Sequence, residues 1–120
     1  KKRRNMKIFE LARWQYGSYT KFHGNKTNLW LHIIAVPLFQ FSFIALIYAL
    51  PSASWFVFFA GLTGCSLSML IQGIGHKKEL NAPVPFTDLW NIFGRIVLEQ
   101  FYSFPRFVFS GCWLKALREK

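Results

Sequence analysis

The feature that most constrains this chain is a run of 49 residues, from Thr27 to Gly75, that contains no Lys, Arg, Asp or Glu. All 20 formally charged residues lie outside this run. A pair of soluble helices needs polar faces toward water, and an uncharged run of this length does not supply them. A long apolar block between basic flanks is typical of an integral membrane protein.

Two membrane-crossing helices are predicted within the block. Residues 29–50 and 55–74 are each long enough to cross ~30 Å of hydrocarbon as a helix. The intervening segment 51–54 begins with a proline and continues with two serines, which are residues that break and cap helices. So short a connection predicts an antiparallel transmembrane hairpin. The fold class is therefore all-α, and the length allows a single membrane domain, residues 1–120.

The charges outside the block predict its orientation. The connection at 51–54 is uncharged, so the positive-inside rule places both termini in the cytoplasm. The host membrane is then the endoplasmic reticulum in a eukaryote or the inner membrane in a bacterium. The basic residues before the block are Lys1, Lys2, Arg3, Arg4, Lys7, Arg13, Lys21 and Lys26, and those directly after it are Lys77 and Lys78.

The net charge of +10 would ordinarily suggest a nucleic-acid partner. Here the basic residues flank an apolar block, so we expect contacts with membrane lipids and not with nucleic acid. Cys65 and Cys112 are the only cysteines, and their spacing frames no disulfide scaffold. The sequence leaves the oligomeric state open.

The flanks are expected to form helices at the membrane surface. Residues 8–19 predict a short amphipathic helix with Ile8, Leu11, Ala12 and Trp14 on its apolar side. Residues 92–117 mix aromatic and charged side chains around a proline. That composition favours a helix in the headgroup region, with a third, kinked embedded segment as the alternative.

The three histidines of the chain are predicted to meet at one place. His32 lies near the start of the first predicted span, and His76 follows the end of the second. The two ends of an antiparallel hairpin are neighbours in space, although these residues are 44 apart in sequence. His23 precedes the first span by a short polar turn and can fold back to the same point. All three imidazoles are therefore expected at the cytoplasmic face.

This convergence predicts a metal site. Glu79 shares a helix face with His76 if the second helix continues, and three imidazoles with a carboxylate suit iron, zinc or another divalent transition metal. Each residue also has a structural interpretation. A single interfacial histidine often contacts headgroups, and Glu79 can pair with a neighbouring lysine or cap a turn. Asn28 and Gln72 can serve as hydrogen-bonding groups within the bundle. Cys65 lies about 16 Å along the helix from His76, too far to share its metal.

Two motifs resemble a known family. Tyr19, His23, Asn28, His32 and Pro37 form the first motif, and the second contains Gln72, Gly75, His76, Glu79 and Pro83. In order and spacing they resemble the membrane 2-hydroxy fatty acid dioxygenases, named for the fungal metabolism of phytosphingosine to odd-numbered fatty acids. The resemblance covers residues 11–109.

The resemblance implies an Fe(II)-dependent enzyme of fatty-acid α-oxidation. Its substrates would be O₂ and a long-chain 2-hydroxy fatty acid, whose hydroxyl and carboxylate can chelate iron. The implied iron ligands are His23, His32 and His76, with Glu79 as a fourth ligand or as a group that orients an imidazole. The predicted substrate-binding residues are Tyr19, Lys26, Asn28, Gln72 and Lys77.

Three other functions remain open from the sequence. The same histidines would suit another metal-dependent lipid-modifying enzyme. Two of them would also suit a membrane haem protein that carries electrons, as axial ligands. A membrane adaptor without bound metal is the third alternative.

Overall fold

The computed structural model describes residues 7–119, and every regular element in that range is helical. The all-α prediction is confirmed. Residues 1–4, whose charges contribute to the predicted orientation, lie outside the described range. In chain order the helices are α1 (Ile8–Gly17), α2 (Tyr19–Phe22), α3 (Lys26–Ser52), α4 (Trp55–Lys77), α5 (Leu89–Leu98), the π-helical turn η1 (Glu99–Ser103), α6 (Phe104–Phe109) and α7 (Cys112–Arg118).

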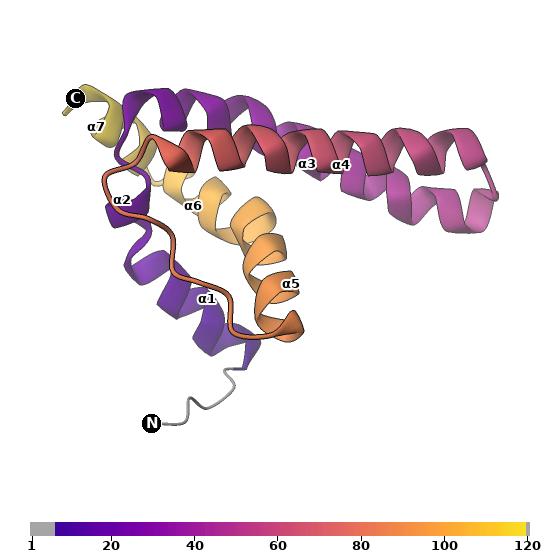
Figure 1. Cartoon of the computed structure of the whole chain (residues 1–120), viewed down its shortest axis with the longest axis horizontal. Coiled ribbons are helices and arrows are strands. Elements are labelled where there is room, and N and C mark those ends of the chain that lie inside the picture. The colour runs from indigo at the N-terminus through magenta and orange to yellow at the C-terminus, as the bar shows by residue number, and fades with distance from the viewer. Residues whose placement is uncertain (1–6, 120) are drawn as a thin grey trace.

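Helices α3 and α4 are the longest elements and lie side by side (Figure 1). The Asn25 side chain caps the start of α3 by accepting from the Asn28 N–H, and Ser54 caps α4 by accepting from the Val57 N–H. Between the two helices Ala53 adopts a left-handed conformation that reverses the chain. Both helices are long and apolar enough to cross a membrane, and each contains one of the predicted spans.

Small residues let these two helices approach closely. A side chain at Gly61 would meet the backbone carbonyl oxygen of Ser42 at 2.8 Å, and one at Gly64 would overlap the Ser42 side chain. Further along, the Ser68 hydroxyl donates to the Ala35 carbonyl at 2.6 Å. Close backbone contact of this kind, with a serine as an interhelical donor, is a common packing mode for helices in lipid.

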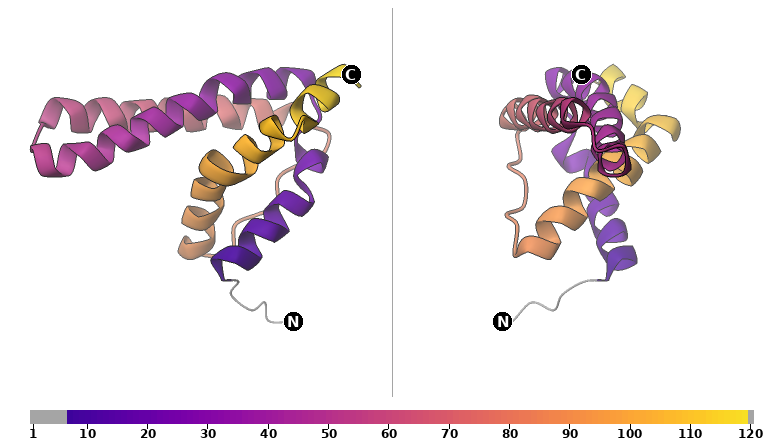
Figure 2. Two further views of the ribbon diagram at one scale, coloured as in Figure 1. Left: turned by 180° about the vertical axis from the view of Figure 1, so that it is seen from behind. Right: turned by 90° about the vertical axis from the view of Figure 1, so that its right-hand side faces the viewer.

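The remaining helices pack at one end of the α3–α4 pair and leave its far half uncovered (Figures 1 and 2). Elements α5, η1 and α6 follow one another without a break over residues 89–109, and they lie against α1. The Gln15 side chain joins the two, because its amide donates to the Arg95 carbonyl and its oxygen accepts from the Ser103 hydroxyl. The predicted 92–117 segment is thus divided, with a turn at Ser110 and Gly111 before α7.

We expect Gly61→Ala to destabilise the protein by about 1–3 kcal/mol, because the new methyl group meets backbone that cannot move aside. Gly73→Ala is the matched control on the same helix, since a Cβ there meets nothing within 4 Å. The control should be neutral or stabilising by up to about 1 kcal/mol. Thermal unfolding in detergent measures both. Equal midpoints for the two variants would contradict the packing described for α3 and α4.

Candidate metal centre

Three imidazoles from three parts of the chain meet at the covered end of the α3–α4 pair. His23 ends the short helix α2, His32 lies in the second turn of α3, and His76 lies in the last turn of α4. Their ring centroids are 4.8–4.9 Å apart in all three pairs, with the rings steeply inclined to one another. One potential ligand atom from each lies within 4.8 Å of the other two.

Backbone carbonyls set the tautomers of two of these histidines. The Nδ1 atom of His23 lies 2.9 Å from the Tyr19 carbonyl oxygen, and the Nδ1 of His32 lies 3.1 Å from that of Asn28. A carbonyl only accepts, so each Nδ1 carries the hydrogen, and in the neutral ring the lone pair is on Nε2. Both Nε2 atoms are buried without a hydrogen-bond partner. This is the state in which an imidazole binds a metal.

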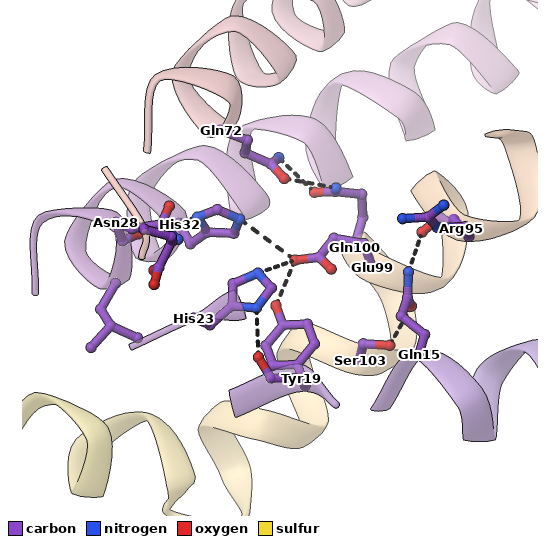
Figure 3. Close-up of polar contacts among 12 residues, drawn as sticks. Gln15, Tyr19, His23, Asn28, His32, Gln72, Arg95, Glu99, Gln100 and Ser103 are labelled. Atoms are coloured by element: carbon purple, nitrogen blue, oxygen red, sulfur yellow. Dashed lines mark hydrogen bonds and ion pairs between the residues drawn. The ribbon is translucent and has the colours of Figure 1, made fainter. Parts of the chain in front are cut away.

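The carboxylate of Glu99 faces these two nitrogens (Figure 3). Its Oε2 atom lies 3.4 Å from the Nε2 of His23 and 3.6 Å from the Nε2 of His32. Burial alone raises the pKa of Glu99, whereas protonated His23 and His32, together with the Tyr19 hydroxyl, would lower it to about 2. With both rings neutral that positive charge is missing, and a divalent metal between the carboxylate and the two Nε2 lone pairs would supply it.

Tyr19 holds the Glu99 carboxylate and His23 in place. Its hydroxyl donates to Glu99 Oε2 at 2.5 Å, and its ring stacks on the His23 imidazole with centroids 3.7 Å apart. Burial and the adjacent Glu99 charge raise the pKa of Tyr19 well above its usual value. The phenol therefore stays protonated and acts as a donor.

Glu79 contacts the backbone near the histidines. Its carboxylate accepts hydrogen bonds from the N–H groups of Gly24 and Asn25 at 3.0–3.1 Å and from the Asn28 side-chain amide at 2.6 Å. Helix α4 ends at Lys77, so Glu79 does not continue the helix face of His76 as the spacing suggested. Its observed role is to fasten the turn after His23 to the end of α4.

Glu99 is the site residue that sequence reasoning missed. A buried amide pair fixes the adjacent backbone, because Gln72 and Gln100 exchange two hydrogen bonds of 2.9 and 3.0 Å. Gln40 also donates to the Gln100 carbonyl at 2.6 Å. The sequence feature that could have pointed to Glu99 is the polar pair Glu99 and Gln100 at the end of an apolar helical stretch.

A cavity of about 640 Å³ opens beside the histidines. Of the predicted substrate-binding residues, Tyr19, Gln72 and Lys77 line it. Asn28 is fully buried and donates to Glu79, and Lys26 is exposed at the start of α3. The cavity therefore joins the candidate metal centre to a space of the size that small-molecule ligands occupy.

One comparison with known proteins gives a match. The family model described as "2-hydroxy-palmitic acid dioxygenase Mpo1-like" matches residues 9–103, most of the chain. Among curated proteins and solved structures, none matches.

We predict that His32→Ala and His76→Ala each abolish metal retention, because each removes one of three converging ligands. Cys65→Ala should keep the metal, since that thiol lies about 16 Å along α4 from His76. Metal analysis of the purified variants, together with their unfolding temperatures, measures this. Stoichiometric metal in both histidine variants would refute the assignment.

Glu99→Gln should weaken divalent-metal binding about 10–100-fold, as changes to groups surrounding metal ligands do. The variant keeps an oxygen that can accept from Tyr19, so the fold should persist. Glu119→Gln is the control, because it removes one carboxylate from an exposed position at the end of α7. Metal titration of all three proteins compares them. Unchanged affinity in Glu99→Gln would show that the carboxylate does not face the ion.

Proposed function

The chain belongs to the family of Mpo1-like 2-hydroxy-palmitic acid dioxygenases, and from this premise we propose that it is an Fe(II)-dependent enzyme of fatty-acid α-oxidation. It converts a long-chain 2-hydroxy fatty acid and O₂ into the acid one carbon shorter, CO₂ and water. The oxidative decarboxylation releases four electrons, and reduction of O₂ to water consumes four. The reaction therefore needs no external reductant and no 2-oxo acid co-substrate.

The observation that carries this proposal is the pair of buried, unpartnered Nε2 atoms facing the Glu99 carboxylate. Imidazole and carboxylate donors suit iron, whereas magnesium and calcium favour all-oxygen sites. His23, His32 and His76 would hold the iron, and Glu99 would supply negative charge beside it. Bound Fe(II) supplies the one-electron chemistry that O₂ requires. The three rings are in mutual contact, which leaves no room for a porphyrin between any two of them and disfavours the haem alternative.

The residues of the cavity support a carboxylic acid substrate. Lys77 lines it near His76 and offers positive charge for the headgroup. Glu79, already engaged with the Gly24 and Asn25 backbone, keeps the turn after His23 closed. Gln72 is held by Gln100 and Ser68 and borders the same space. In this proposal these residues bind the substrate and orient it at the histidines, and Lys77 supplies the charge that attracts its carboxylate.

We place the protein in a membrane, with α3 and α4 as its spans and both termini in the cytoplasm. Large apolar side chains are exposed along the uncovered half of the pair, among them Phe41, Tyr48, Leu50, Trp55 and Phe56. Such an extended apolar surface requires a covering, and lipid is the covering that the length and composition of these helices suit.

We predict that iron-loaded protein consumes O₂ with a 2-hydroxy C16 or C18 acid and releases the acid one carbon shorter. The unsubstituted C16 acid should react far more slowly, because it lacks the hydroxyl that pairs with its carboxylate. Oxygen uptake and product analysis, without added reductant, measure the reaction. An absence of oxygen uptake by iron-bound protein would refute the reaction and leave the metal site standing.

The topology is tested separately by labelling. A cysteine placed at Ser52, in a protein whose native cysteines are replaced, should react only with reagents on the non-cytoplasmic side. A cysteine placed at Lys78 is the control and should react from the cytoplasm. Labelling of position 52 from the cytoplasm would overturn the proposed orientation.

A further inference from the structure

The cavity beside the histidines has a mainly apolar lining with polar side chains among it. Tyr19, His23, His76 and Glu99 line it at the candidate metal centre. Most of the remaining lining is apolar and comes from α1, α4, α5 and the loop between α4 and α5. A ligand that fits this space has a small polar head and a hydrocarbon body.

One face of α4, here called the α4 track, lines the cavity and leads away from the candidate metal centre. The Gln72 amide on this face is already bonded to Ser68 and Gln100, so Met69 and Gly73 are its apolar positions. Met69, Gln72, Gly73 and His76 all line the cavity and follow one another at helical spacings of three, one and three residues. They therefore share a face of the helix. Met69 lies about 10 Å along the axis from His76, and Gly73 lies one turn from it. In the proposed orientation this track runs from the cytoplasmic end of α4 toward the interior of the bilayer.

Gly73 is not explained by helix packing. On the same helix, Gly61, Gly64 and Gly75 each face an atom of α3 that an added Cβ would hit, whereas a Cβ at Gly73 meets nothing within 4 Å. A glycine within a helix costs about 1 kcal/mol relative to alanine. Because position 73 has no side chain, the cavity stays open there, one helical turn from His76.

The wall opposite this track is held by Arg95. Its guanidinium donates to the carbonyl oxygens of Val84 at 2.8 Å and Pro85 at 3.2 Å. It also lies over the rings of Trp14 and Phe86, 5.2 and 4.4 Å from their centroids. These contacts tie the α4–α5 loop to α5 and α1, so this side of the cavity is built from fixed parts.

We propose that the α4 track binds the alkyl chain of the fatty acid and that Gly73 determines how long a chain the site accepts. This inference rests on the proposed function for the identity of the head. With the carboxylate near Lys77 and the hydroxylated carbon near the histidines, the chain passes Gly73 first and Met69 next. The carbons nearest the carboxylate lie between the histidines and Gly73. Only longer chains reach the space left by the absence of a side chain at Gly73.

The first test compares Gly73→Leu with Gly17→Leu across 2-hydroxy acids from C4 to C18. A Cβ at Gly17 also meets nothing within 4 Å, and this exposed glycine at the end of α1 does not face the cavity. Gly73→Leu should lower kcat/KM for C16 and C18 acids at least about tenfold, the effect of methylenes that a pocket cannot accommodate. Gly73→Leu should lower C4 turnover by a smaller factor than C16 turnover. Gly17→Leu should give the wild-type profile at every chain length. A wild-type chain-length profile in folded, metal-loaded Gly73→Leu would overturn the proposal.

The second test reads binding and needs no turnover. Wild-type protein is irradiated with a C16 2-hydroxy acid that carries a photoreactive diazirine at mid-chain, and the labelled residues are identified by mass spectrometry. Labels at Met69, Gln72, Gly73 or Ile96, removed by excess 2-hydroxy C16 acid, would support the track even if no reaction occurred. Labels confined to the exposed apolar residues of the α3–α4 pair would overturn it. Gly73→Ala, which adds one methyl group, replaces the leucine variant in the first test if that variant does not fold.

Discussion

A largely buried carboxylate that faces two imidazole nitrogens is the interaction on which the candidate site depends. Burying an ion is costly unless charge and hydrogen bonds compensate it. Glu99 receives one strong hydrogen bond, from Tyr19, and otherwise faces the lone-pair positions of His23 and His32. A cation bound among them would offset the cost of burying the Glu99 carboxylate and the Nε2 atoms of His23 and His32. The three histidines could hold a metal ion, and the facing carboxylate would supply negative charge beside it.

The fold brings the donors to this point by separate means. Packing of α3 against α4 sets His32 beside His76. Glu79 then fastens the turn that carries His23, because the free N–H groups before α3 require an acceptor and its carboxylate supplies one. The π-helical turn provides the last donor, since the amide pair behind it anchors the backbone from which Glu99 projects. Turns of this kind occur frequently at functional sites.

The sequence predicts more of the helix pair than of the site. The charge-free run is sufficient to predict two long helices, and their short connection brings His32 near His76. A shared helix face for His76 and Glu79 was predicted only if the second helix continues; α4 stops at Lys77, and the Glu79 carboxylate accepts from the Asn25 N–H. Glu99 could not be paired with His32 or His23 from the sequence, because it lies 67 and 76 residues from them and no periodicity links separate helices. A π-helical turn also shifts the helical register at Glu99.

Iron-edge X-ray absorption on anaerobically purified protein tests the central claim most directly, because it reports the metal and its neighbours together. The account predicts about one iron per chain, with the scattering pattern of several imidazole rings, additional light-atom ligands and no sulfur. Folded protein that binds no iron, or iron whose spectrum lacks imidazole scattering, would contradict it.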